Sequence, residues 1–212
     1  MAYIGSKPAD KPVVASDLDP TIITGQTALA TAPADTDEFL ISDAGVLKRL
    51  DASLVGGGGI TEADQWRLTT SFTGDANPIA SNLARVNTDG GGKIGTGLSQ
   101  SSGIFTFPST GTWLIIFQCA SQSESGQADS YHINYIETTT DNSTYSQAAS
   151  GWGSGAATYR SGASAFFTFN VSSTTTHKVR FSKSNGNAAT YTLGTAGLNY
   201  TSMTFIRLGD ST

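Results

Sequence analysis

Apolar and polar residues alternate along most of the chain from residue 66 onward. Successive side chains of a strand point to opposite faces, so this alternation is typical of strands with one buried face, and helical spacing is essentially absent. Glycine, asparagine, aspartate and serine, which favour turns, separate the apolar runs. The pattern predicts eight strands, at residues 66–72, 103–107, 112–120, 130–138, 164–171, 177–182, 190–193 and 202–208. Such a succession of short strands predicts an all-β protein, a β-sandwich or jelly roll.

The most informative local pattern is Phe-x-Phe, proline, glycine, aromatic. Phe105 and Phe107 stand on alternate positions and therefore face the same side of a strand. Pro108 cannot donate to a strand ladder, and the turn that it begins lets Gly111 take a backbone angle that other residues avoid. Trp113 then opens a second apolar run. The pattern predicts two strands joined by a turn.

Turn residues mark four connections, at residues 88–92, 140–143, 150–155 and 184–187. The pair Asn185-Gly186 is the strongest hairpin signal, because both residues tolerate the positive φ angles of a type I′ turn. We therefore expect a tight hairpin between the strands at 177–182 and 190–193.

Charge divides the chain into two parts. Residues 1–64 carry four basic and ten acidic side chains, whereas residues 65–212 carry eight basic and seven acidic ones. The first part is rich in alanine, aspartate, proline and threonine, a composition that cannot bury enough surface to order itself alone. We therefore expect an extended acidic arm with a glycine-rich linker at residues 1–59 and a head domain at residues 60–212.

Composition argues against several kinds of partner. The formal charge of −5 and the lack of a Lys/Arg cluster predict that the chain does not bind nucleic acid. No window approaches the roughly 20 apolar residues that span a bilayer, and no signal peptide is recognisable, so we expect no membrane insertion and synthesis in a cytoplasm. Cys119 is the single cysteine, which rules out an intrachain disulfide framework. Its place on an apolar strand predicts a buried, inert thiol.

The arm contains one segment with strand character. Phe39–Ile41 supplies a first strand, Ser42–Gly45 supplies turn residues, and Val46 and Leu47 start the return. The segment predicts a small β-hairpin, and an unstructured acidic linker is the alternative.

Catalytic and metal-binding patterns are absent from the sequence. His132 and His177 fall on predicted strands without a Gly-x-Ser-x-Gly elbow, and the acids of the head lie on separate turns and strand ends. Residues 87–90 resemble a calcium loop only superficially, because they offer one carboxylate and no later glutamate at the required spacing. We expect a protein that is not an enzyme and holds no cofactor or metal.

The Phe-x-Phe, proline, glycine, aromatic pattern is followed by the apolar run Trp113–Phe117, and the chain ends with an alternating strand at 202–208. Together these features resemble the jelly-roll family of tumour necrosis factor and the globular head of complement. The resemblance covers roughly residues 66–208 and implies a homotrimer that binds other molecules, with the last strand at the centre of a sheet. The collagen-like repeat of complement is missing, so the resemblance implies no immune function.

Two predicted strands, 113–117 and 166–169, come close to being apolar on both faces and therefore need cover on both. One face can meet the opposite sheet and the other a neighbouring subunit around a threefold axis. A monomeric sandwich with a thick core is the alternative. The residues that we assign to the core and the trimer contact are Phe105, Phe107, Trp113, Ile115, Phe117, Phe167, Phe169 and Phe205.

The segment at residues 35–50 resembles a short module of bacteriophage tail-fibre and virion proteins. The opening residues, 3–5 and 7–12, resemble the leader of such proteins in phages of marine and freshwater bacteria. The resemblance implies that the arm attaches to other virion proteins. The residues that we assign to this anchoring are Tyr3, Ile4, Phe39, Leu40, Ile41, Leu47 and Leu50.

Aromatic residues among serine, glycine and asparagine resemble the chemistry of adaptable binding surfaces. Tyr145, Trp152 and Tyr159 fit this description and are our candidates for host contact at exposed hairpin tips. Local packing beneath a long loop is the alternative.

These features predict a non-enzymatic virion protein of a bacteriophage. The leading hypothesis is a trimeric tail fibre or fibre tip, attached to the particle by its arm and binding a glycan or protein of the host surface through its head. The alternative is a trimeric capsid decoration protein whose arms clamp neighbouring capsid subunits. A glycan-degrading spike would need a pair of carboxylates about 5 to 10 Å apart.

Overall fold

The computed structural model describes residues 25, 27, 29–31, 33, 34, 36–55, 59–124 and 126–212. The chain divides into two compact units, Met1–Gly58 and Gly59–Thr212. Among the described residues, no helix is long and apolar enough to cross a membrane.

The first unit contains the predicted hairpin. Strand β1 (Glu38–Asp43) pairs with β2 (Val46–Asp51) in antiparallel register, and a single 3-10 turn, η2 (Ala52–Leu54), follows. Ala44 and Gly45 form the two-residue turn with φ angles of 51° and 82°. Positive φ at both central positions matches the right-handed twist of the strands, which is why the pair closes a tight hairpin. The anchoring candidates Tyr3 and Ile4 lie outside the described residues.

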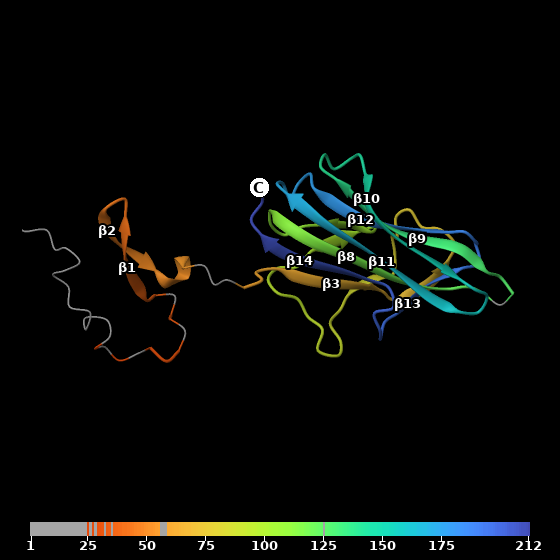
Figure 1. Cartoon of the computed structure of the whole chain (residues 1–212), viewed down its shortest axis with the longest axis horizontal. Helices are drawn as coiled ribbons and strands as arrows, with labels where there is room; N and C mark the ends of the chain where they lie inside the picture. Colours follow the sequence, from red (N-terminus) through yellow and green to blue (C-terminus); the bar gives the residue numbers. More distant parts are fainter. Residues whose placement is uncertain are drawn as a thin grey trace, which may run out of the picture. The chain divides into compact units, whose positions relative to one another are not determined.

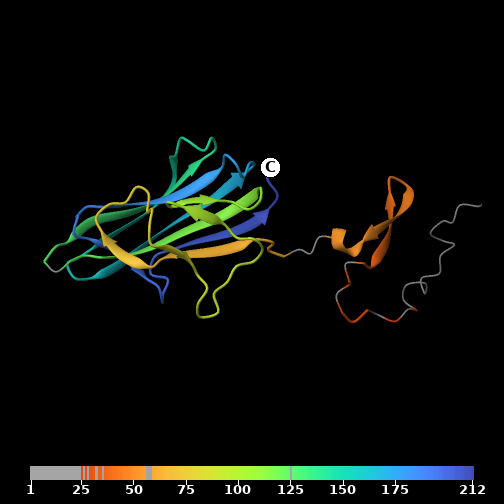
Figure 2. The ribbon, with the colours of Figure 1, turned by 180° about the vertical axis from the view of Figure 1, so that it is seen from behind.

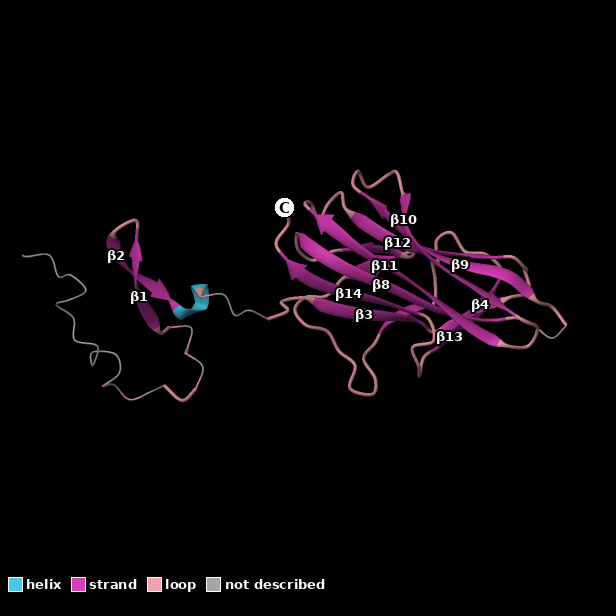
Figure 3. Ribbon diagram, viewed as in Figure 1, coloured by secondary structure: helices cyan, strands magenta, loops and turns pink. Residues whose placement is uncertain are grey.

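The second unit is a β-sandwich of two antiparallel sheets (Figure 3). The five-stranded sheet has the order β10-β9-β12-β7-β6, and its strands are β6 (Ser99–Ser101), β7 (Ile104–Thr106), β9 (Asp129–Thr139), β10 (Ser146–Gly155) and β12 (Lys178–Asn185). The strands of the seven-stranded sheet are β3 (Ala63–Leu68), β4 (Thr70–Thr73), β5 (Leu83–Arg85), β8 (Gly111–Gln122), β11 (Arg160–Val171), β13 (Tyr191–Thr195) and β14 (Ser202–Gly209). The predicted all-β jelly roll is confirmed.

The last strand, β14, lies inside the seven-stranded sheet. It pairs with β8 on one side and with β3 on the other, and β11 pairs with β8 beyond it, so these four strands run side by side (Figure 1). The end of the chain is therefore held at the centre of a sheet.

Seen from behind, the yellow-green loop between β5 and β6 projects from the same unit (Figure 2).

Aromatic rings from both sheets fill the space between them. Phe105 is the middle residue of β7. Its ring centroid is 5.5 Å from that of Phe181 and 5.2 Å from that of Phe205. Seven of the eight assigned core residues are buried, and Phe167 is partly buried against the cluster. The buried seven are Phe105, Phe107, Trp113, Ile115, Phe117, Phe169 and Phe205.

The expected hairpin at Asn185-Gly186 is wrong. Neither residue has a positive φ angle, and the strands on either side belong to different sheets, β12 to one and β13 to the other. The backbone amide of Asn185 donates to the Asp75 carboxylate at 2.7 Å, and that of Gly186 donates to the carbonyl of Tyr131 at 2.8 Å. These long-range bonds hold the pair in a connection that crosses from one sheet to the other.

The expected turn at residues 150–155 is also wrong, because these residues belong to β10. A Cβ placed on Gly151 would come within 2.3 Å of the backbone oxygen of Ser164, and one on Gly153 within 2.2 Å of Nε2 of His132. The glycines therefore let β10 lie against β11 and over His132, so here they are strand residues that permit close packing.

Candidate binding surfaces

The outward side of the seven-stranded sheet carries a row of apolar residues. Trp113, Ile115 and Phe117 of β8 point into the sandwich and are buried, whereas Leu114 and Ile116 point outward and remain partly exposed. The register places Phe166 of β11 on one side of Ile116 and Thr204 of β14 on the other. Leu114 has Thr168 and Ile206 in the equivalent positions. We call Ala63, Leu114, Ile116, Phe166 and Ile206 the outer-face patch.

Phe166 is the most exposed member of the outer-face patch. Its side chain is 62% exposed, and β11 pairs only with β8 among the described strands. The two rows that cross the sheet at Leu114 and Ile116 include no charged side chain. An uncharged, partly apolar sheet face is typical of an interaction surface.

Phe166 was not among the assigned trimer residues, which included Phe167 and Phe169 instead. Those two point inward; Phe169 is buried and Phe167 is partly buried. The pairing of Phe166 with Ile116 decides which phenylalanine faces outward, and pairing between strands is not readable from the local sequence.

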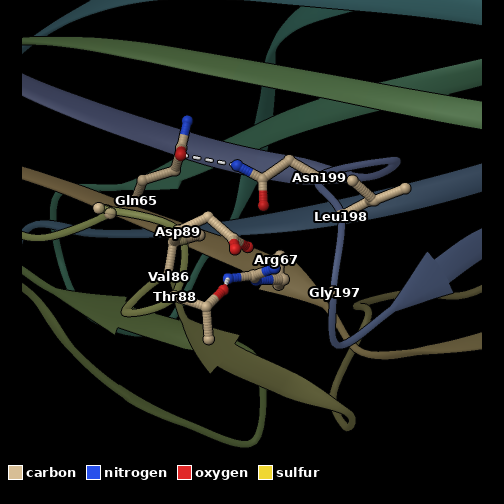
Figure 4. A pocket seen from close by; sticks show the side chains of 10 residues that line it. Gln65, Arg67, Val86, Thr88, Asp89, Gly197, Leu198 and Asn199 are labelled. Atoms are coloured by element: carbon tan, nitrogen blue, oxygen red, sulfur yellow. Dashed lines mark hydrogen bonds between the residues drawn. The ribbon is translucent and has the colours of Figure 1, made fainter.

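A pocket with a volume of about 420 Å³ opens beside the outward face of β3 (Figure 4). Arg67 is buried there, and its Nη2 donates to Oγ1 of Thr88 at 2.7 Å. Nδ2 of Asn199 donates to Oε1 of Gln65 at 2.7 Å, and the buried Oδ1 of Asn199 has no partner. The lining groups are one guanidinium, two amides, a hydroxyl and the carboxylate of Asp89, so the pocket can bind a polar group, but they include no nucleophile with an adjacent base.

The three aromatic candidates for host contact have different environments. Trp152 is 66% exposed and Tyr159 is 69% exposed. Trp152 lies within β10 rather than at a hairpin tip, and its Nε1 donates to Oγ of Ser150 at 3.1 Å. Its outward position follows from the alternation of β10.

Tyr145 is not an exposed tip residue. Its ring centroid lies 4.2 Å from the guanidinium carbon of Arg180, and its hydroxyl is buried without a hydrogen-bond partner. Burial raises the pKa of Tyr145, and the charge of Arg180 opposes that rise. For Tyr145, the alternative of local packing therefore applies instead of exposure at a hairpin tip.

The connection between β9 and β10 is fixed by one carboxylate. Asp141 accepts hydrogen bonds from the hydroxyl of Thr139 and from the backbone amides of Thr144 and Ser143, at 2.7 to 2.8 Å. These bonds hold the pKa of Asp141 well below its usual range. The sequence predicted a turn at 140–143, and this is the interaction that forms it.

Ser161, His132 and Asp129 lie in line, but not as a working triad. Oγ of Ser161 is 3.5 Å from Nε2 of His132, and Nδ1 of His132 is 3.4 Å from the Asp129 carboxylate. His132 is fully buried, and the backbone of β10 at Gly153 covers its Nε2. Burial lowers the pKa of His132. A substrate would have to displace the strand to reach the ring. Within the described part of the chain, no three His, Cys, Asp or Glu side chains gather as a metal-binding set.

The hairpin of the first unit exposes much of its apolar surface. Phe39, Leu40 and Leu47 are exposed, whereas Ile41 and Leu50 are partly buried. An isolated two-stranded hairpin is marginally stable, so packing on a partner would stabilise it.

The sheet order, the central last strand and the aromatic core define a jelly-roll sandwich, and its fold is similar to that of tumour necrosis factor proteins. Solved structures with this architecture include Eiger TNF from S. frugiperda, which is 10% identical to this chain, covers 73% of it and 96% of its own length, and has a TM-score of 0.53. Murine APRIL at pH 5.0 is 11% identical over 69% of this chain and 98% of its own, with a TM-score of 0.50. The globular domain of zebrafish Complement 1qA protein is 14% identical over 71% and 99%, with a TM-score of 0.46.

No family model and no curated protein matches the chain. At identities this low, the structural likeness defines the fold alone.

Proposed function

We propose that this chain is a non-enzymatic binding protein that assembles as a homotrimer through the outer-face patch. The observation that carries the proposal is the exposure of Phe166 beside Ile116 on an uncharged sheet face. Apolar area removed from water contributes about 25 cal/mol per Å², so covering this face favours association. The jelly-roll fold of this type, which often forms trimers, supports a threefold arrangement of copies.

The trimer is the head of a bacteriophage tail fibre or fibre tip in our proposal. The arm attaches it to other virion proteins, and the exposed apolar residues of the β1–β2 hairpin provide the contact. Trp152 and Tyr159 are the side chains that we assign to host binding. The support is the resemblance of residues 35–50 and of the leader to virion proteins.

The oligomeric state tests the self-association. The full chain should have the mass of three copies by size-exclusion chromatography with light scattering. Phe166→Glu should reduce it to one copy, because the interface would then bury an unpaired charge. Trp152→Glu is the matched control, since it places the same charge on an equally exposed aromatic of the opposite sheet. A monomeric wild-type chain, or a trimeric Phe166→Glu, would contradict the proposal.

The place in the particle is tested separately, by quantitative mass spectrometry of purified virions scaled to the major capsid protein. Tens of copies per particle are expected for a fibre. Hundreds of copies would indicate the capsid decoration protein instead, and absence from the particle would overturn both virion roles without affecting the trimer.

A further inference from the structure

One end of the sandwich interior is polar. Along β12 the inward positions change from Val179 and Phe181 to Lys183, and along β9 they change from Ile136 to Asn134. Lys183 is 2% exposed and Asn134 is 0% exposed. Burial of an amine and an amide among apolar rings is costly unless they bond to each other. The register pairs the two residues directly across the neighbouring strands.

The two side chains meet with a defined orientation. Nζ of Lys183 donates to Oδ1 of Asn134 at 3.2 Å. On its other side, Nδ2 of Asn134 donates to the backbone carbonyl of Ala163 at 2.7 Å. The second bond fixes the orientation of the Asn134 side-chain amide, so that its carbonyl group faces the amine of Lys183.

Burial shifts the equilibrium of Lys183 toward the uncharged amine. Burial lowers the pKa of Lys183, while the nearby Cys119, Asp129 and Asp75 oppose that fall. A neutral lysine amine is a nucleophile, whereas the ammonium form is not. Asp129 is a buried carboxyl group that lies 3.4 Å from Nδ1 of His132, and its charge acts on Lys183. Its position in this closed space makes it the acidic side chain that we assign to proton transfer.

We propose that Lys183 and Asn134 join in an intramolecular isopeptide bond. The lone pair of Nζ attacks Cγ of Asn134, the bond from Cγ to Nδ2 breaks, and a new amide forms between the side chains. One proton leaves Nζ and reaches the departing Nδ2, which is released as ammonia, and Asp129 relays that proton. No atom is oxidised or reduced, so no co-reactant is needed.

The bond ties β9 to β12 between residues 49 positions apart in the sequence. A covalent link of this kind restricts the unfolded chain and holds the two strands together when the sheet is pulled or heated. This inference does not depend on the trimer or on the virion role.

The intact mass of the purified full chain, measured after denaturation, tests the proposal. We expect a mass lower than that of the sequence by one ammonia molecule, and a proteolytic fragment that contains the segments around Lys183 and Asn134 joined together. A folded wild-type chain with the full sequence mass would overturn the proposal, because the two groups would then be only hydrogen-bonded.

Three variants separate this bond from other losses of ammonia. Lys183→Met should restore the full mass. Asn134→Asp should lose one water molecule instead, because the same amide would form from a carboxyl group. Lys178→Met is the matched control and should keep the loss of ammonia: Lys178 is also largely buried, but its Nζ donates to the backbone carbonyl of Thr174 at 2.6 Å.

Ring closure at Asn185-Gly186 to a succinimide also releases ammonia, and the variants exclude it. A loss that persists in Lys183→Met would assign the ammonia to such a ring and contradict the isopeptide bond. Asp129→Asn should slow or stop the loss of ammonia, as expected of a proton relay, while the chain keeps its β-sheet circular dichroism.

Discussion

The ring centroid of Phe107 lies 5.1 Å from that of Trp113, with the ring planes at 55°. Phe107 follows the last residue of β7 in the five-stranded sheet, and Trp113 belongs to β8 in the seven-stranded sheet. The turn that Pro108 begins therefore crosses from one sheet to the other and brings both rings into the core. A single local pattern in the sequence connects the two layers of the sandwich.

Trp113→Ala should lower the free energy of unfolding by about 3 to 5 kcal/mol, because it leaves a cavity between the sheets. Trp113→Phe should cost less, since the indole N–H has no hydrogen-bond partner to lose and a ring is kept. Chemical denaturation measures both. Trp152→Ala serves as the control for an exposed tryptophan, and a wild-type stability for Trp113→Ala would contradict the core position.

Gly111→Ala should destabilise the head by about 1 to 3 kcal/mol. Gly111 has a φ angle of 148°, and a Cβ there would lie 2.6 Å from the backbone oxygen of Gly209 and 2.5 Å from Nε of Arg207. The arginine can move, but the carbonyl of a central strand cannot do so cheaply. Gly209→Ala is the matched control, because a Cβ at that position would have no atom within 4 Å. Equal melting temperatures for the two variants would contradict this account.

Alternation and turn residues were sufficient to predict the sandwich. The strands around Phe105, Trp113 and Phe205 were predicted because their buried faces repeat every second residue, which is a local property. The tight turn of the arm was predicted for the same kind of reason, since Gly45 offers the positive φ angle that it needs. The side chains that point into the core followed from these patterns.

The parts that could not be predicted depend on contacts between distant strands. The sequence of β10 predicts a turn because it contains three glycines. In the structure Gly151 and Gly153 instead allow the strand to lie close to Ser164 and His132. Phe166 faces outward because of its register with Ile116, and Tyr145 is covered because Arg180 lies 35 residues later in the chain and stacks on it. The positions of the side chains on the candidate binding surfaces depend largely on such contacts between distant strands.

Asp64→Asn should lower the free energy of unfolding by about 2 to 4 kcal/mol. The buried Asp64 carboxylate accepts hydrogen bonds from Arg85, from Nε1 of Trp66 at 3.0 Å and from the backbone amide of Leu98 at 2.8 Å. An asparagine amide would turn one acceptor into a donor facing these donors and would remove the negative charge that faces Arg85. Thermal unfolding measures the loss, and Asp210→Asn is the control because the Asp210 carboxylate is almost fully exposed.

His132 should make the head less stable as the pH falls. Burial lowers its pKa in the folded state, and Asp129 only partly opposes this. Below the ordinary histidine pKa of about 6.5, the unfolded chain therefore binds a proton that the folded chain does not. The free energy of unfolding should fall by at most about 1.4 kcal/mol per pH unit from this group, beginning near pH 6.5 and ending at the folded pKa.

His132→Gln checks that assignment. The stability difference between wild type and this variant should stay constant between pH 7 and pH 8, where the histidine is neutral in both states. It should shift in favour of the variant on going from pH 6.5 to pH 5. A difference that is independent of pH across both ranges would exclude His132 as the titrating group.

Tyr145 and Trp152 should respond in opposite ways to substitution. Tyr145→Ala removes the ring that stacks on Arg180, so it should destabilise the head by about 1 kcal/mol and leave any host binding unchanged. Trp152→Ala removes an exposed side chain and should change the stability by less than about 0.5 kcal/mol. If the exposed rim binds the host, virions carrying Trp152→Ala should adsorb to host cells more slowly than wild-type virions, and those carrying Tyr145→Ala should adsorb normally. Thermal unfolding and adsorption rates measured on the same two variants separate packing from binding, and slower adsorption for Tyr145→Ala alone would reverse the assignment.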